Sequence, residues 1–180
     1  YYIAQVKRRL EVRKRSGIGY WGLDVSRDAV RMAAKRYKGI TFFIADVWKG
    51  VLFEDSSISV LLDIFAPRNA SEFARVLKQN GLMLIVIPGP GHLEELRTDL
   101  KLLGIEADKR EQVVKQFSPA FRLTRQQPLN YDMLLAGDEL HDLVTMTPNY
   151  RHISKEKLEG LKERSMRVKA DFDILEFVKV

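Results

Sequence analysis

The sequence of 180 residues contains no cysteine. A disulfide framework, a thiolate zinc site and a cysteine nucleophile are therefore excluded within it. It has no apolar run near the roughly 18 residues of a membrane span, and its first residues lack the pattern of a signal peptide. The composition predicts a single cytoplasmic domain over residues 1–180, with no membrane segment.

Two common nucleotide-binding motifs are also missing. No GxGxxG follows a strand-like run, and no GxxxxGK[ST] occurs, so the sequence has neither a complete dinucleotide fingerprint nor a P-loop. The GIGYWG that begins at Gly17 is no substitute, because it leads into a strand-like run and not into a helix.

The formal net charge is +6, and basic residues crowd near the N-terminus. They are Lys7, Arg8, Arg9, Arg13, Lys14 and Arg15, opposed there only by Glu11. Such a patch can neutralise nucleic-acid phosphates. It is equally typical of a solvated helix face.

Hydrophobic periodicity predicts alternating helices and strands in the first half. An amphipathic helix over 1–15 precedes a strand in GIGYWGLDVS and a helix capped by Ser26. Strand-like runs follow at 40–47 and 58–67, then a helix at 71–81 ending on Gly81, and a strand at 82–88 buried on both faces. This order predicts a mostly parallel sheet in a doubly wound α/β fold.

The second half predicts a different arrangement. A helix begins near His92, and residues 121–126 alternate like a strand. Helices are expected at 137–146 and 154–164 before a closing strand at 170–180. Two late strands separated by helices fit an antiparallel edge hairpin with a long helical insertion.

Ligands of open α/β sheets bind beyond the carboxyl ends of the strands, where this sequence places two acids. Asp24 can accept hydrogen bonds from ribose hydroxyls, or it can be a turn or cap residue. Asp46 can accept from an adenine amine while Val47 packs on the ring, or it can be an ordinary loop aspartate. Together the two acids favour an adenosine-containing cofactor.

Two later strand ends carry proline and glycine, in IFAPRNA at 64–70 and PGPGHL at 88–93. These turns can present backbone groups toward a cleft, or they can simply terminate the strands.

An ordered set of motifs matches one family across nearly the whole chain. GLDVS is followed by KRY, IFAP, LKxxG, IPGPGHLxEL, GDE and MTP. The sequence resembles the bacterial 23S rRNA (guanine-N1)-methyltransferases, with PGPGHL and MTP as the more specific motifs. The resemblance implies a Rossmann-like class I methyltransferase fold, S-adenosylmethionine as methyl donor, and a guanine of 23S ribosomal RNA as acceptor.

The resemblance also implies roles by position. Asp24 and its neighbour Val25 would hold the cofactor ribose, and Asp46 and Val47 would lie near the adenine. His92 would contact the cofactor.

The acceptor side of the cleft would lie after the strand at 58–67. Phe65, Ala66 and Pro67 would line it, with Ala66 and Pro67 beside the cofactor. Phe65 is a candidate for stacking on the base, although a core phenylalanine fits as well. Asp63 is a candidate for removing the guanine N1 proton, because burial could raise its pKa, or it is a structural carboxylate.

The sequence departs from the family in two ways. Members begin with a four-cysteine zinc module, so zinc is expected there and no metal is expected here. They also have a first strand that ends in a D-x-G-C-G-E-G loop, and this sequence starts at the Tyr1–Tyr2 that would follow it. We therefore expect a domain truncated at the N-terminus, in which two strands lack a central neighbour.

These departures keep other functions open. A small-molecule methyltransferase of the same fold and a non-catalytic RNA-binding fragment both fit the residues. The sequence does not decide whether the chain forms a homodimer, nor which guanine is the target.

Overall fold

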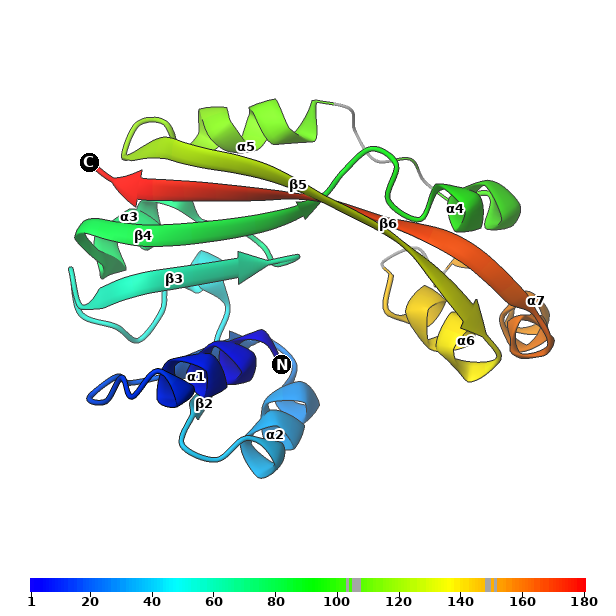
Figure 1. The fold of residues 1–180 in the computed structure, drawn as a ribbon, viewed down its shortest axis with the longest axis horizontal. Coiled ribbons are helices and arrows are strands. Elements are labelled where there is room, and N and C mark those ends of the chain that lie inside the picture. The colour runs from blue at the N-terminus through cyan, green and yellow to red at the C-terminus, as the bar shows by residue number, and fades with distance from the viewer. Residues whose placement is uncertain (103, 105–107, 148–149, 151) are drawn as a thin grey trace.

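The computed structural model describes residues 1–102, 104, 108–147, 150 and 152–180 (Figure 1). The N-terminal unit contains α1 (Tyr2–Val12), β1 (Trp21–Asp24), α2 (Arg27–Arg36), β2 (Thr41–Ile44) and the 3-10 turn η1 (Val47–Lys49). β1 and β2 pair in parallel. The hydroxyl of Ser26 accepts a hydrogen bond from the Ala29 backbone N–H, so the predicted N-cap of α2 is confirmed.

The main sheet has the strand order β3-β4-β6-β5. Its strands are β3 (Ile58–Ile64), β4 (Leu77–Pro88), β5 (Phe121–Ala136) and β6 (Ser165–Lys179), and α3 (Ala70–Val76) connects the first two. β3 and β4 are parallel, whereas β6 is antiparallel to both β4 and β5. The predicted edge hairpin with a helical insertion is confirmed.

The long β5–β6 ribbon joins two hydrophobic cores (Figure 1). We call the first core the buried residues Phe73, Leu77, Met83, Ile85, Ile87, Val113, Phe117, Phe121, Leu175 and Phe177, to which α5 (Lys109–Phe117) contributes. The second core, Leu93, Leu96, Leu140, Val144, Leu161 and Val168, lies under the far half of the ribbon.

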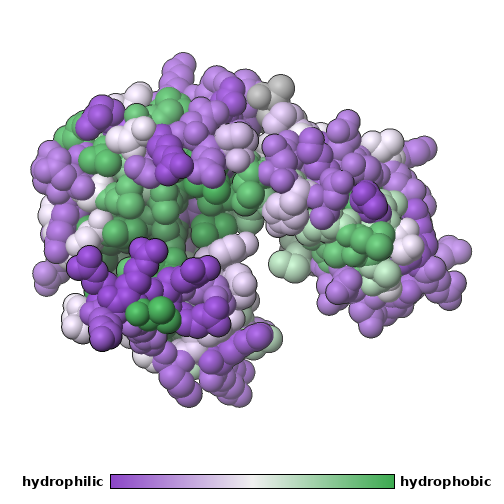
Figure 2. Space-filling view, in the orientation of Figure 1, coloured by the Kyte–Doolittle hydropathy of each residue, from purple (hydrophilic) through white to green (hydrophobic). Residues whose placement is uncertain are grey.

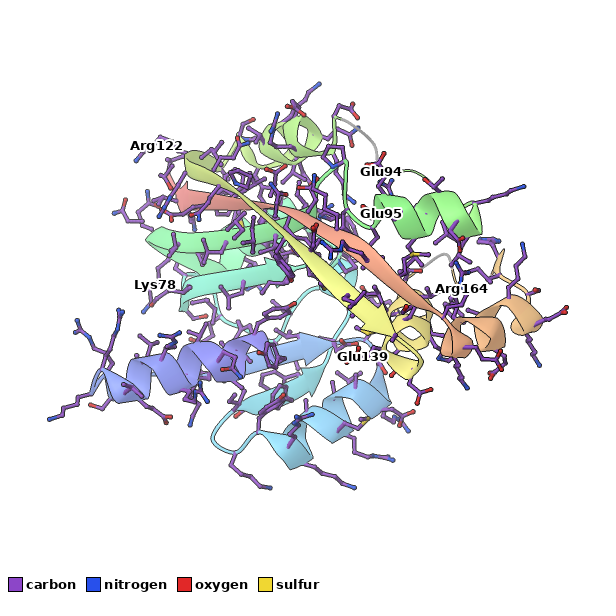
Figure 3. All side chains as sticks on the ribbon, turned by 45° about the vertical axis from the view of Figure 1, so that its right-hand side comes forward. Lys78, Glu94, Glu95, Arg122, Glu139 and Arg164 are labelled. Atoms are coloured by element: carbon purple, nitrogen blue, oxygen red, sulfur yellow. The ribbon has the colours of Figure 1, made fainter. Side chains whose placement is uncertain are left out.

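The second core holds together the distal helices α4 (Glu94–Leu100), α6 (Asp138–Thr145), α7 (Lys155–Gly160) and the turn η3 (Leu161–Glu163). Figure 3 shows Arg164 in this distal lobe, where its guanidinium donates to both carboxylate oxygens of Asp99 at 2.8 and 3.0 Å. Glu95 fastens α4 to β6 by accepting from the Lys169 backbone N–H. The lobe is therefore anchored to the ribbon by apolar packing and by charged hydrogen bonds.

Two parallel strands have a free edge. In the part of the chain that the structure describes, β1 pairs only with β2, and β3 pairs only with β4. Two strands with one neighbour each are what the resemblance predicted. Figure 2 shows apolar surface in the recess above the N-terminal helices, and Trp21, Leu23 and Val60 are large apolar residues exposed on these strands.

The N-terminal unit is tied to the main sheet through α3. The Arg75 guanidinium donates to the carbonyl oxygens of Val51 and Phe53, and the Glu72 carboxylate accepts from the Val51 backbone N–H at 2.7 Å. The Phe53 ring also packs edge-on against Trp21, with centroids 5.7 Å apart. The Phe53 ring also lies 5.9 Å from that of Phe43 on β2, so polar bonds and two aromatic contacts place β1 and β2 relative to the larger sheet.

The structure differs from the predicted secondary structure in four details. The helix expected at 71–81 ends at Val76, because fully buried Leu77 is extended and pairs with Ile58. Residues 82–88 form a strand as predicted, but β4 is fully buried on one face only and half-buried on the other. α5 was not predicted, and both ribbon strands begin earlier or end later than expected.

Candidate functional site

Two carboxylates lie at the carboxyl ends of the adjacent strands β1 and β2: Asp24 is the last residue of β1, and Asp46 comes two residues after β2. The Ala45 backbone N–H donates to the Asp24 carbonyl, which keeps these strand ends together. Asp24 Oδ1 accepts from the Ser26 N–H at 2.8 Å, and Asp46 Oδ1 accepts from the Trp48 N–H at 3.0 Å. Each acid therefore stabilises its own turn through one oxygen.

The second oxygen of each carboxylate is free for a ligand. Among the described residues, Oδ2 of Asp24 and Oδ2 of Asp46 accept no protein hydrogen bond. Val47 packs against the first core and can form the wall of an adjacent pocket, whereas Val25 is 66% exposed. This pair of oxygens can accept from two neighbouring hydroxyl or amine groups.

The segment after β3 combines a buried acid with an exposed ring. Asp63 is only 3% exposed, and burial raises its pKa to about 7, although the Arg68 guanidinium and the Ala66 backbone N–H oppose the shift. Its Oδ1 lies 4.0 Å from Arg68 and accepts no hydrogen bond from the described residues. Phe65, by contrast, is 49% exposed, and Ala66 and Pro67 beside it are exposed as well.

The PGPGHL loop after β4 is fastened to β6 by Asp171. The Asp171 carboxylate accepts from the Gly91 N–H at 2.9 Å, and its carbonyl accepts from the Gly89 N–H at 2.9 Å. A Cβ on Gly89 would lie 2.6 Å from Asp171 Oδ2, so only glycine fits this approach.

Asp171 also determines which ring nitrogen of His92 carries the proton. The Asp171 backbone N–H donates to His92 Nδ1 at 3.3 Å, so the ring proton belongs on Nε2. Burial lowers the pKa of His92, while the charges of Asp171 and Arg97 act in opposite directions. His92 is therefore a neutral imidazole with one N–H to donate.

Phe172 brings the two loops together. Its ring lies 5.2 Å from that of Phe65 and 4.6 Å from that of His92, between centroids. Phe65 and His92 were predicted from the sequence, whereas Asp171 and Phe172 were not. Their only signal was an aspartate and a phenylalanine at the start of the apolar run ADFDILEFVKV.

Positive charge is concentrated in the N-terminal unit. Residues 1–50 contain twelve Lys and Arg against four Asp and Glu, whereas residues 51–180 contain eighteen against twenty. On and after α1, Lys7 pairs with Glu11 at 2.7 Å, and the other five basic residues of the patch are exposed. This surface can attract a polyanion, and it is equally consistent with a solvated helix face that binds nothing.

Curated proteins match this sequence over most of its length. The chain is 35% identical over 136 residues to the 23S rRNA (guanine(748)-N(1))-methyltransferase of Streptomyces fradiae, covering 76% of the chain and 49% of that protein. It is 33% identical over 159 residues to YxjB of Bacillus subtilis, which is named as a 23S rRNA (guanine-N(1)-)-methyltransferase by inference. That match covers 86% of this chain and 55% of YxjB.

The chain is a relative of the 23S rRNA (guanine-N1)-methyltransferases. It spans about half the length of the curated relatives that it matches. No family model matches the sequence.

Solved structures share the fold at low sequence identity. MccD superimposes with a TM-score of 0.57 at 17% identity, covering 99% of this chain and 86% of that one. The N-methyltransferase NodS from Bradyrhizobium japonicum gives 0.50 at 8% identity, with 89% and 73% covered. The predicted class I methyltransferase fold is confirmed.

The described residues contain neither a membrane-spanning helix nor a cluster of metal-ligating side chains. No helix there is long and apolar enough to cross a membrane. No group of three or more histidine, aspartate or glutamate side chains is placed to hold a metal ion in that part of the chain. Pro148 of the MTP motif lies outside the described residues.

Proposed function

We propose that this chain carries the adenosine-binding and acceptor-binding parts of an S-adenosylmethionine-dependent 23S rRNA (guanine-N1)-methyltransferase. The main support is the pair of carboxylates, Asp24 and Asp46, each with a free oxygen at the end of neighbouring parallel strands. The relatives' names supply the substrate class, RNA.

The residues present fit the adenosine end of the cofactor. Free carboxylate oxygens suit ribose hydroxyls at Asp24 and the adenine amine at Asp46, with Val25 and Val47 as apolar neighbours. We assign Ala66, Pro67 and His92 to the side of the cofactor that faces the acceptor, because they follow the carboxyl ends of β3 and β4.

The chain's own contribution is mainly to hold the acceptor. Bound S-adenosylmethionine supplies a methyl group on a sulfonium, which reacts by in-line displacement, so alignment and exclusion of water dominate. Phe65 offers an exposed ring for the base, and the His92 Nε2–H can donate to a carbonyl oxygen.

Asp63 is our candidate for accepting the N1 proton. A carboxyl with a pKa of about 7 is matched to proton transfer at neutral pH. Asp63 is only 3% exposed, and the Arg68 guanidinium lies 4.0 Å from its Oδ1. The proposal therefore requires the surroundings of Asp63 to open when the base binds.

Methyl transfer tests the function directly. The 180-residue chain, alone and joined to the N-terminal half of the Streptomyces fradiae relative, is incubated with methyl-labelled S-adenosylmethionine. The acceptors are unmodified 23S rRNA and a pool of small metabolites, with Asp24→Ala as the control variant. Label on N1 of a guanine supports the proposal, and label confined to small molecules identifies a different acceptor class. No transfer by either protein contradicts the enzymatic function.

A further inference from the structure

Three aromatic rings form a continuous surface beside the loops after β3 and β4. Phe172 on β6 lies 5.2 Å from Phe65 and 6.3 Å from Tyr131 on β5, between ring centroids. We call Phe65, Tyr131 and Phe172 the aromatic platform. None of them belongs to either hydrophobic core.

The platform is unusually open for aromatic side chains that touch. Phe65 is 49% exposed and Tyr131 is 47% exposed, whereas the core rings of Phe117 and Phe177 are at most 1% exposed. Phe65 also has φ +55°, a left-handed conformation that is strained for a bulky residue and is found where function or tight surroundings require it. Folding alone does not account for such an exposed and strained ring.

The location of the platform matches an acceptor site. Phe65 directly follows the carboxyl end of β3, and Phe172 pairs with Pro88 at the carboxyl end of β4. Ligands of open α/β sheets bind beyond these ends. Tyr131 and Phe172 come from the two strands of the ribbon, and their ring planes are inclined by 53° to one another.

The basic helix α1 begins within electrostatic range of one platform residue. Burial raises the pKa of Tyr2 on α1, with a smaller contribution from the neighbouring Tyr131 and then from Tyr1. The Tyr2 side chain is therefore within electrostatic range of the Tyr131 hydroxyl, and the exposed Arg8 and Arg9 follow along the same helix. A negatively charged chain lying on α1 can reach the platform.

We propose that Phe65, Phe172 and Tyr131 stack on a guanine that is turned out of the RNA chain while α1 holds its phosphates. This inference deepens the proposed function and rests on it for the identity of the base. Aromatic faces beside positive charge are the combination that recognises single-stranded nucleic acid.

The test compares two RNA hairpins that differ in one base. One carries a single guanine in its loop, and the other is abasic at that position. Binding to the 180-residue chain without cofactor is measured by fluorescence anisotropy at fixed salt. One base stack is worth roughly 5-fold to 150-fold in affinity, so the wild-type chain should prefer the intact loop by a factor in this range.

The variants remove single rings. Tyr131→Leu and Phe172→Leu should lose most of the preference for the intact loop and keep the wild-type affinity for the abasic hairpin. Tyr131→Phe should retain the preference, because the ring face remains. Trp48→Leu, which removes an aromatic residue 63% exposed outside the platform, should leave the preference unchanged. Tyr131 is half-exposed, so its variant stays informative if Phe172→Leu fails to fold.

Two results would overturn the inference. One is equal binding of both hairpins by the wild-type chain, which would mean that these rings do not stack on the guanine. The other is a preference for the guanine that survives Tyr131→Leu. The methyl-transfer assay is independent of this binding test. If RNA is labelled but the ring variants still prefer the intact hairpin, the platform alone is refuted. If the ring variants lose that preference but no RNA is labelled, the platform is supported and the enzymatic function is refuted.

Discussion

Replacing Asp63 with asparagine should stabilise the protein at alkaline pH and not at acidic pH. Asp63 is 3% exposed, and burial raises its pKa from 3.8 to about 7. Below pH 4 the carboxyl is protonated in both the folded and the unfolded chain, so burial costs little. Between pH 4 and 7 only the folded chain keeps the proton, and the free energy of unfolding falls as the pH rises. Above pH 7 the penalty is constant.

The size of the effect follows from the shift. A rise of about three pH units, at about 1.4 kcal/mol per unit, gives an upper limit of about 4 kcal/mol. Asparagine removes this cost but leaves the Arg68 guanidinium, 4.0 Å away in the native protein, without its carboxylate. We therefore expect Asp63→Asn to gain about 2 kcal/mol at pH 8 and less than about 0.5 kcal/mol at pH 4.

Urea unfolding of both proteins at the two pH values measures this difference. Asp132→Asn is the matched control, because its side chain is 60% exposed and its ion pair with Arg167, at 3.7 Å, lies at the surface. That control should change the free energy of unfolding by less than about 0.5 kcal/mol at both pH values. An Asp63→Asn protein that is less stable than wild type at pH 8, or equally affected at both pH values, refutes the reasoning.

The same variant separates a catalytic from a structural role for Asp63. If Asp63 accepts the N1 proton, methyl transfer by the wild-type protein should rise with pH through about 7, and Asp63→Asn should abolish that dependence together with most of the activity. Full activity in the more stable variant would leave Asp63 a structural carboxylate.

Three further predictions concern the cofactor and RNA surfaces. Asp24→Ala should weaken S-adenosylmethionine binding about tenfold in titration calorimetry without lowering the melting temperature by more than a few degrees, because its carboxylate is exposed and holds only the Ser26 turn. Reversing Arg8, Arg9, Arg13 and Lys14 to glutamate should reduce the slope of log K for RNA binding against log salt concentration by roughly 0.7 to 0.9 per lost phosphate contact. Reversing Lys155, Lys157 and Lys162 in the distal lobe should leave this slope unchanged. Adding the first strand and glycine-rich loop of a relative should enlarge the thermal shift that S-adenosylmethionine produces; an equal shift in the 180-residue chain would mean that its own residues form the whole cofactor site.

The strand ends could be located from the sequence because local and tertiary preferences agree there. Asp24 and Asp46 follow short apolar runs, and both runs are strands that end at or before these acids. The order of elements then determined the parallel pairing and the antiparallel edge hairpin. The assignments of Asp24, Asp46, His92 and Phe65 to ligands remain predictions.

Other features depend on contacts between distant segments and could not be predicted. Residues 77–81 are rich in helix formers, but Leu77 is extended because its pairing with Ile58 and its burial outweigh local propensity. In the middle of β5, residues 125–132 are exposed on both faces, so they show none of the alternation that identifies a strand. Their conformation is fixed by the ladder to β6.

The acceptor side of the site depends on one strand more than on any motif. β6 contributes Leu175 and Phe177 to the first core and Val168 to the second, and Asp171 and Phe172 lie between these anchors. Because both ends of this segment are held by buried side chains, the Asp171 carboxylate can fix the glycine loop after β4 while Phe172 meets the ring of Phe65. Asp171 thus contacts Gly91, 80 positions away in the sequence, and Phe172 contacts Phe65, 107 positions away. The geometry of these rings is therefore a property of how the two cores share β6, and we expect a change of packing in the distal lobe to displace Phe172 through that strand.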